Sequence, residues 1–261
     1  MPDVTALLTA YDNQLRPAET ENLPAGTSVD TDGPIRRVLG RHRGFIGAPV
    51  DLGLAGPAVD ALIARQRDFF AARGEGVEWK TYGHDRPADL PGRLLAAGFV
   101  AEPAETVLIG SAAALAEGNP ALPTGVALRE VSEPVDLRRI AELATMVWAE
   151  DRGWLADELA ARIANGAVVV AAEAGDLLVS SSRLEFVPGT EFAGLWGGST
   201  LAEWRGRGIY RALVAYRAQL AVTRGARYLQ VDASEDSRPI LQRLGFTAVT
   251  TTTPYVWTPT S

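Results

Sequence analysis

Hydrophobic residues in the C-terminal half recur at spacings typical of amphipathic helices and half-buried strands. Ile209, Leu213 and Tyr216 fall on one face of a helix, which predicts a helix over 209–224 with Gly225 after its last turn. The other predicted elements are a strand at 126–131, helices at 135–148 and 155–164, strands at 167–173, 177–186, 192–201 and 228–233, a short helix at 236–244, and a final hairpin. This order predicts an α+β fold with a mixed sheet.

The N-terminal half carries a similar order of elements. The predicted elements are a helix at 4–15, an exposed loop at 16–33, strands at 35–39 and 45–50, a helix at 58–72, a strand at 77–82, a short helix at 87–97, and a strand at 105–110. In both halves a Gly-Phe pair, Gly98-Phe99 or Gly245-Phe246, precedes the last strand. We therefore predict an internal repeat of two lobes, 1–118 and 124–261, joined by residues 112–125. The alternative is that two α+β halves look alike by chance.

Arginine and glycine are concentrated between the predicted strand at 192–201 and the helix that follows. The stretch reads Arg205-Gly206-Arg207-Gly208, and Arg211 lies in the first helical turn. Free backbone N–H groups and the positive end of the helix dipole converge at such a point, and glycine lets an anion approach the backbone closely. The pattern therefore predicts a phosphate-binding loop.

Three other interpretations of this loop are open. A dinucleotide-binding turn would need a third glycine where Arg211 stands. A nucleic-acid tract fits poorly with the formal net charge of -7 and with the apolar helix that follows. The third interpretation is a purely structural turn.

Residues 205–210 resemble the Arg/Gln-x-x-Gly-x-Gly/Ala loop of the Gcn5-related N-acetyltransferases (GNATs). The resemblance extends from Val126 to the C-terminus and includes Leu244-Gly245-Phe246 at the separation expected of the family. It implies the GNAT fold, as two tandem lobes of the kind found in mycothiol synthases. The N-terminal lobe is expected to be degenerate, because its loop 52–57 has neither arginine nor a Gly-x-Gly pair. Tyr210 departs from the family pattern, which prefers Gly or Ala there.

The resemblance implies that the protein binds acetyl-CoA and needs no metal. In the family, the loop binds the pyrophosphate, and free backbone groups of the strand before it bind the pantetheine arm and the thioester carbonyl. Ser234 stands where the family commonly has Asn at the start of a short helix. Carried over to this sequence, the cofactor-binding residues are Gly198, Ser199, Thr200, Arg205, Gly206, Arg207, Gly208, Ile209, Tyr210, Arg211 and Ser234.

The resemblance fails at the groups that transfer protons. Some members carry a Glu general base that falls on Gly194 here, and many carry a Tyr general acid that falls on Leu241. A carboxylate near the acceptor could receive the amine proton through water. Asp232, at the end of a predicted strand, and Glu150, between two predicted helices, are the substitutes that position suggests. Each could instead be a solvated surface acid.

Aromatic residues and histidines are secondary candidates. Four tryptophans are predicted on the acceptor side of the second lobe, where they could shape a pocket or fill the core: Trp148, Trp154, Trp196 and Trp204. Both histidines, His42 and His84, lie in the predicted N-terminal lobe. His84-Asp85 is predicted to cap the helix that follows it rather than to act in catalysis.

The composition limits the chemistry and the partners. The 261 residues contain no cysteine, which excludes disulfides, thiolate metal sites and cysteine nucleophiles. Neither a membrane span nor a signal peptide is visible, so we expect a soluble, cytoplasmic protein with no membrane partner. The net charge disfavours nucleic acid as a partner. A homodimer is left open.

The leading hypothesis is an acetyl-CoA-dependent N-acetyltransferase that acts on a primary amine of a small molecule or peptide. Gly194 and Leu241 motivate a second hypothesis, a non-catalytic module that binds or senses acyl-CoA. Transfer of a longer acyl group is a third. Thiol release across a panel of amines separates the first two, because a sensor would bind acetyl-CoA and release no thiol.

Overall fold

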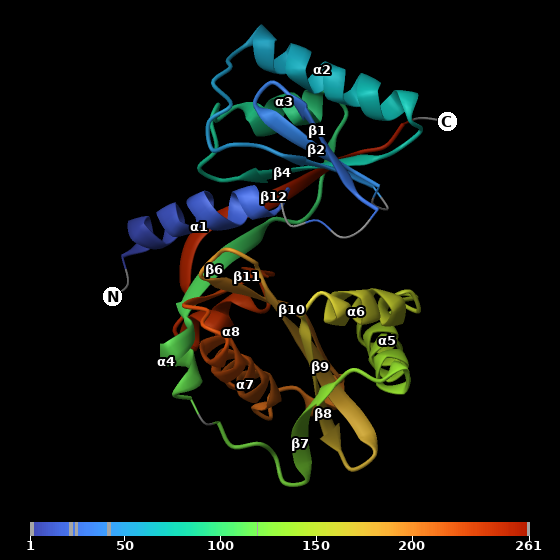
Figure 1. The fold of residues 1–261 in the computed structure, drawn as a ribbon, viewed down its shortest axis with the longest axis vertical. Helices are drawn as coiled ribbons and strands as arrows, with labels where there is room; N and C mark the ends of the chain where they lie inside the picture. The colour runs from blue at the N-terminus through green and yellow to red at the C-terminus, as the bar shows by residue number, and fades with distance from the viewer. Residues whose placement is uncertain (1–2, 21–22, 24–25, 41–42, 119, 260–261) are drawn as a thin grey trace. The chain divides into compact units, whose positions relative to one another are not determined.

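The computed structural model describes residues 3–20, 23, 26–40, 43–118 and 120–259. They form two compact units. Unit 1 comprises Met1–Leu108, Asp232–Ile240 and Thr247–Ser261, and unit 2 comprises Ile109–Val231 and Leu241–Phe246. Each unit is built of helices on a mixed sheet (Figure 1), which confirms the predicted α+β class.

Unit 2 contains a sheet in the strand order β7-β8-β9-β10-β11. Neighbouring strands are antiparallel except β10 and β11, which are parallel. Helices α5 and α6 lie on one side of this sheet and α7 lies on the other (Figure 1). The elements are α4 (Ala112–Ala116), β7 (Val126–Val131), α5 (Pro134–Trp148), α6 (Leu155–Ala164), β8 (Val168–Ala174), β9 (Leu177–Phe186), β10 (Phe192–Thr200), the 3-10 helix η1 (Ala202–Trp204), α7 (Ile209–Thr223) and β11 (Tyr228–Ala233).

The core of unit 2 follows from the apolar stripes of its helices. On α5, Leu137 and Ile140 point at the sheet, where they pack with Val169 of β8 and Leu159 of α6. Strand β8 is buried from Val168 to Ala172, as expected for a strand covered on both faces. These contacts fix the positions of β9 and β10, which lead to the glycine-rich loop.

Unit 1 contains a sheet in the strand order β1-β2-β3-β4-β12. Here β3 and β4 are parallel, and the other neighbours are antiparallel. Its elements are α1 (Val4–Ala18), β1 (Ser28–Asp32), β2 (Ile35–Leu39), β3 (Gly44–Gly47), α2 (Pro57–Ala72), β4 (Val77–Tyr82), α3 (Leu90–Ala96), β5 (Val100–Ala101) and β12 (Thr247–Trp257). The chain passes between the two units within β6 (Glu105–Ser111), β11 and α8 (Arg238–Arg243), and once more between Phe246 and Thr247.

Strand β12 belongs to unit 1 although it lies at the C-terminal end of the sequence. It is antiparallel to β4, with Trp257 opposite Val77 and Thr252 opposite Tyr82. Tyr255 and Trp257 are buried in the core of unit 1. The predicted lobes 1–118 and 124–261 divide the chain at one place. The compact units instead each contain segments from different parts of the sequence, because β12 pairs with β4 of the N-terminal half.

Three sequence predictions about secondary structure were wrong. The final hairpin is absent from the described residues, because 247–257 form one continuous strand. Within the predicted loop 16–33, β1 forms an exposed edge strand that lacks apolar alternation, and ion pairs from Arg37 to Asp30 and Asp32 fasten it to β2. The predicted join contains α4, whose start is capped by the Ser111 hydroxyl.

The length and polarity of the helices bear on whether any of them could cross a membrane. Among the described residues, every helix is too short or too polar to span a bilayer.

Candidate functional site

The glycine-rich loop connects β10 to α7 through η1. Gly208 is the residue before the helix, and its φ of 86° lies in the left-handed region. A side chain in that region costs roughly 1–2 kcal/mol, so glycine is favoured there. The N–H of Ala212 donates to the carbonyl oxygen of Gly208 at 3.0 Å, which starts the helix directly after the loop.

The loop and the first turn of α7 leave a run of backbone N–H groups without acceptors. Among the described residues, none accepts a hydrogen bond from the N–H groups of residues 206–211. Gly208 also supplies no side-chain cap. Because these donors lie at the positive end of the helix dipole, the head of α7 can bind an anion through several N–H groups at once.

Three arginines, Arg205, Arg207 and Arg211, lie within or next to this run of N–H groups in the sequence. Arg205 donates from Nε to the carbonyl oxygen of Thr200 at 3.1 Å, and the Arg207 guanidinium lies 4.8 Å from the centroid of the Trp204 ring. Arg211 is exposed in the first turn. Within the described part of the chain, none of the three forms an ion pair with a carboxylate. Their charges are therefore available to an anionic ligand.

Strand β10 separates from β11 before it reaches the loop. The two strands are paired over Phe192, Ala193 and Gly194. Beyond that point β10 stays on β9, with a bulge between Trp196 and Ser199. In the described residues, the β10 edge that faced β11 thus has no strand partner over the last residues before the loop, and its backbone groups can bind an extended ligand.

Tyr210 lies against the bulge of β10. A Cβ placed on Gly198 would be 3.5 Å from Cε2 of Tyr210, so the ring packs onto the backbone of the bulge. Burial raises the pKa of the Tyr210 phenol. The bulky side chain thus packs against β10 rather than pointing into solvent.

The fold of the chain resembles that of solved structures over most of its length, whereas its sequence matches no family model and no curated protein. A GCN5-related N-acetyltransferase from Kribbella flavida superposes with a TM-score of 0.73 at 19% identity, over 95% of each chain. A tandem GNAT protein from the clavulanic acid biosynthesis pathway gives a TM-score of 0.66 at 18% identity, over 92% of this chain and 86% of that chain.

The chain has the two-lobe GNAT fold. A third structure, a GCN5-related N-acetyltransferase from Sphaerobacter thermophilus, agrees with this at a TM-score of 0.62 and 13% identity, over 88% of this chain and 82% of that chain. The predicted resemblance is therefore confirmed as a fold. Unit 2 presents the loop that this fold was expected to carry.

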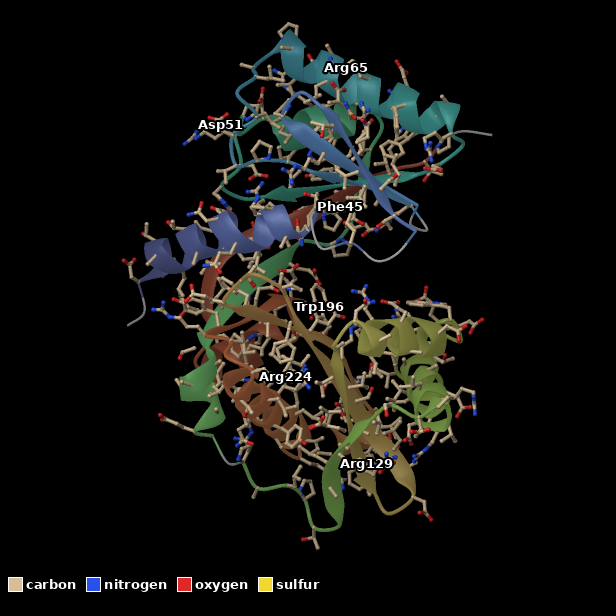
Figure 2. The ribbon with its side chains drawn as sticks, viewed as in Figure 1. Phe45, Asp51, Arg65, Arg129, Trp196 and Arg224 are labelled. Atoms are coloured by element: carbon tan, nitrogen blue, oxygen red, sulfur yellow. The ribbon has the colours of Figure 1, made fainter. Side chains whose placement is uncertain are left out.

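Trp196 occupies the space next to Gly194, the position at which some GNATs carry a Glu. A Cβ placed on Gly194 would overlap Nε1 of the Trp196 indole. The indole of Trp196, labelled in Figure 2, is 37% exposed and occupies the position from which a Glu side chain at residue 194 would extend. Glu185 is the cross-strand partner of Gly194, but its carboxylate is paired with Arg183 and, at 3.1 Å, with Arg162.

We expect Gly194→Ala to destabilise unit 2 by about 1–3 kcal/mol, because the added methyl group overlaps the indole of a packed neighbour. In a Trp196→Ala background the same change should cost less than about 0.5 kcal/mol, since the obstacle is gone. Urea unfolding of the four chains measures this coupling. Gly198→Ala is the matched control, because its Cβ meets Tyr210 at an ordinary 3.5 Å. If Gly194→Ala lowered the free energy of unfolding equally in both backgrounds, the overlap between its methyl group and the Trp196 indole would be contradicted.

The two predicted catalytic carboxylates are engaged in ion pairs. Asp232 accepts from Nζ of Lys80 at 3.0 Å, and its side chain is 5% exposed. Lys80 also donates to Glu19 at 3.0 Å. Glu150 has a side chain that is 68% exposed and pairs with Arg152 at 2.9 Å. Neither of these pairs includes a residue of the glycine-rich loop.

The remaining predicted positions have local structural partners. Ser234 accepts from the N–H of Ser237 at 3.4 Å and contacts its hydroxyl at 3.2 Å, as a side chain does at a helix start. Ser234 belongs to unit 1, unlike the glycine-rich loop. Leu241, at the position of the family's acid, is fully buried.

The tryptophans only partly follow the prediction. Trp148, Trp154 and Trp196 are exposed, so they do not fill the core. Trp148 donates from Nε1 to the Ser199 hydroxyl at 3.1 Å and thereby joins the end of α5 to β10. Among the described aromatic contacts, none joins two of the four tryptophan rings.

His84 does not cap a helix, contrary to the sequence prediction. Its ring bridges two other elements of unit 1, with Nδ1 2.8 Å from the Thr250 hydroxyl and Nε2 3.1 Å from the Asp12 carboxylate. Asp85 accepts from the N–H of Tyr82 at 2.9 Å and so closes the turn after β4. His42 lies outside the described residues.

Unit 1 also has two parallel strands, β3 and β4, connected by a helix, α2. In unit 1, however, the backbone groups that follow β3 are hydrogen-bonded. Beyond β3, the N–H of Arg86 donates to the carbonyl oxygen of Val50 at 2.7 Å, and Leu52 donates back to Arg86 at 3.0 Å. Arg16 of α1 donates to the carbonyl oxygen of Ala48 at 2.9 Å. These bonds occupy backbone groups of the kind that β10 leaves open, which agrees with a degenerate N-terminal lobe.

Sequence reasoning missed Arg217, a buried arginine on α7. Its side chain is 1% exposed, and it donates from Nε to the carbonyl oxygen of Leu213 and from Nη1 to that of Arg183, both at 3.0 Å. The signal was present in the sequence, since Arg217 follows Leu213 by four positions and therefore lies on the apolar face of the helix. A lone charged residue on such a face calls for an explanation.

Proposed function

We propose that the protein is an acetyl-CoA-dependent N-acetyltransferase that acetylates a primary amine of a small molecule or peptide. The observation that carries the proposal is the head of α7, where, among the described residues, the N–H groups of residues 206–211 have no acceptor and three neighbouring arginines have no carboxylate partner. A diphosphate satisfies both sets of groups. The open edge of β10 beside this position suits the pantetheine arm, and the GNAT fold of the named relatives supports the same ligand.

The reaction proposed for this site is aminolysis of a thioester. The amine nitrogen forms a bond to the carbonyl carbon, the carbon–sulfur bond breaks, and its electron pair leaves with the sulfur. An N–H from the bulge of β10, at residues 197–199, would stabilise the oxygen that becomes negative. A donor aimed at such an oxygen is worth roughly 3–4 kcal/mol in a site that excludes water.

The proton lost by the amine needs an acceptor, and the structure offers no Glu on β10 for this. We keep Asp232 and Glu150 as proposals that act through water. The exposed Glu150 is the more accessible of the two, because Asp232 is buried against Lys80. An amine that arrives uncharged would need a base only after attack.

A non-catalytic module that binds acyl-CoA is the second candidate. Two observations favour it: Trp196 covers Gly194, and Leu241 is buried where many GNATs have an acid. Such a module would keep the cofactor site and lack the proton-transfer groups. It differs from the enzyme in turnover and not in affinity for the cofactor.

Thiol release in the presence of DTNB tests the proposal directly. The chain contains no cysteine, so every thiol that reacts comes from CoA. With acetyl-CoA and a panel of primary amines, the enzyme should release thiol with at least one amine, and calorimetry should show acetyl-CoA binding. If acetyl-CoA binds but no amine of the panel causes thiol release, the sensing module is favoured. Faster thiol release from propionyl-CoA or a longer acyl-CoA would indicate transfer of a longer acyl group.

A further inference from the structure

Two exposed tryptophan side chains lie at the two ends of the bulge in β10. Trp196 belongs to the strand and is 37% exposed. Trp148, at the end of α5, is 55% exposed and donates from Nε1 to the Ser199 hydroxyl at 3.1 Å. Single exposed apolar side chains are common on any protein surface, whereas a group of them at one structural feature indicates a binding surface.

The bulge brings both indoles to the same face of the sheet. Trp196 is opposite Arg183 of β9, and Ser199 is opposite Ser181. Because Arg183 and Ser181 are two positions apart, their side chains and those of their cross-strand partners point to one face. This is the face covered by α5 and α6 and not by α7 (Figure 1), since Trp148 reaches Ser199 from the end of α5.

The backbone between the two indoles carries no side chain. Gly197 and Gly198 form this part of the bulge, and both are exposed. One indole lies over Gly194 and the other contacts Ser199. The cross-strand partners of these two residues, at positions 185 and 181, are four positions apart on β9, which corresponds to about 13 Å. This length leaves room for one aromatic ring between the indoles.

The charged side chains described on this face beside the bulge pair with one another. Arg183, whose Nη1 lies 3.4 Å from a Cβ placed on Gly197, pairs with Glu185. Glu185 also pairs with Arg162 at 3.1 Å, and Arg162 pairs with Glu158 at 3.2 Å. A ligand with several positive charges therefore finds no free carboxylate among these residues.

Trp148 is fixed in place by its neighbours. The Arg152 guanidinium lies 5.4 Å from the centroid of the Trp148 ring and pairs with Glu150. Ala149, the next residue in the chain, has a φ of 54°, and among the described residues it is the only non-glycine residue with a positive φ. Backbone strain of this kind persists where surrounding contacts impose it, and it is concentrated at functional sites.

We propose that the acceptor is a primary amine attached to an aromatic group, and that this group lies between the indoles of Trp196 and Trp148. The inference rests on the proposed function, because residues 197–199 are where an N–H would stabilise the thioester oxygen and where the amine must arrive. Aromatic rings gain from contact with an indole beyond the area that they bury. The substrate class is therefore an arylalkylamine rather than a polyamine.

Thiol release from acetyl-CoA with three amines tests the substrate class. The amines are 2-phenylethylamine, hexylamine and 1,6-diaminohexane, of which the last two share one chain and differ by one charge. The kcat/KM for 2-phenylethylamine should exceed that for hexylamine about tenfold, and the values for the two aliphatic amines should agree within about threefold. Calorimetry with the CoA complex measures binding of the same amines without turnover.

Four variants assign the preference to the two indoles. Trp196→Leu and Trp148→Leu should each reduce the preference for 2-phenylethylamine over hexylamine about threefold or more, at unchanged KM for acetyl-CoA. Trp148→Phe loses the hydrogen bond to Ser199 but keeps a ring, so it should keep the preference. Trp154→Leu is the control, because Trp154 is 56% exposed and, among the described residues, forms no hydrogen bond or ring contact with β10.

Three results would overturn the inference and leave the acetyltransferase proposal intact. The first is a wild type that acetylates hexylamine or 1,6-diaminohexane at least as fast as 2-phenylethylamine. The second is a preference for 2-phenylethylamine that survives in both leucine variants, or that Trp148→Phe loses as fully as Trp148→Leu. The third is a loss of acetyl-CoA affinity in the leucine variants, which would place the indoles against the cofactor.

Other results separate the two proposals. If acetyl-CoA binds but no amine releases thiol, the acetyltransferase proposal is rejected. In that case, binding of 2-phenylethylamine to the CoA complex that is lost in Trp196→Leu would still support an aromatic amine site, and absence of such binding would reject the inference as well. A wild type that binds no acetyl-CoA would reject both.

Discussion

Replacing Gly208 by Glu is expected to weaken CoA binding about 100-fold or more, which corresponds to roughly 2.8 kcal/mol. The new carboxylate would lie among the free N–H groups at the head of α7, bind them and the neighbouring arginines itself, and repel a diphosphate. The chain should still fold, because a Cβ on Gly208 meets Nη2 of Arg211 at 3.4 Å and the carbonyl oxygen of Ala121 at 3.6 Å. Calorimetry with CoA measures the loss.

Gly56→Glu is the matched control for this variant. Gly56 precedes α2 in unit 1 as Gly208 precedes α7, and its φ of 54° with ψ of -133° strains a side chain more than the left-handed helical conformation of Gly208 does. A Cβ at Gly56 meets nothing within 4 Å. This control should lose at least as much stability as Gly208→Glu and still bind CoA like the wild type. Unchanged affinity in Gly208→Glu, or a loss in Gly56→Glu alone, would show that the cofactor site has been placed in the wrong unit.

Trp257→Ala is expected to destabilise unit 1 by about 3–5 kcal/mol, although Trp257 lies at the far end of the sequence. Its side chain is 9% exposed and belongs to the core cluster that includes Trp79 and Phe70. A loss of this size is a large fraction of the stability of a typical domain. The physical reason is that β12 contributes Tyr255 and Trp257 to a core otherwise built from the first half of the chain.

Hydrogen exchange locates the damage. Amides of β2 and β4 should lose protection in Trp257→Ala, while amides of β8 and β9 in unit 2 keep theirs. Trp154→Ala is the control, because Trp154 is 56% exposed and its removal should change stability by less than about 0.5 kcal/mol. If the chain instead folded as separate lobes 1–118 and 124–261, the protection lost would be that of β10 and β11.

The elements that sequence predicted best are those whose evidence is local. The strands predicted at 126–131, 177–186 and 228–233 coincide with β7, β9 and β11, and the helix predicted at 209–224 ends one residue later than α7. Their alternation or helical period is set by burial of one face, so it is written within each segment. Edge strand β1 has no such pattern, because it is held by backbone hydrogen bonds to β2 and by ion pairs with Arg37 and not by burial of an apolar face.

The glycine-rich loop shows which parts of a site a sequence motif can predict. Its arginines and glycines indicate an anion site from the sequence, because free N–H groups follow from a helix start and glycine alone tolerates the φ of Gly208. The motif did not indicate which proton-transfer groups accompany it. Asp232 and Glu150 were selected by position along the chain, and their ion pairs with Lys80 and Arg152 depend on side chains that position cannot reveal.

The amino-acid sequence by itself determined the α+β class, the order of most elements and the chemistry of the loop before α7, because each depends on neighbours within a few positions. Tertiary structure decided the rest. The indole of Trp196 closes over Gly194, Arg217 is buried beside the bulge of β10, and β12 pairs with β4. These three facts arise from packing between side chains and strands, and packing is fixed only when distant segments share one core.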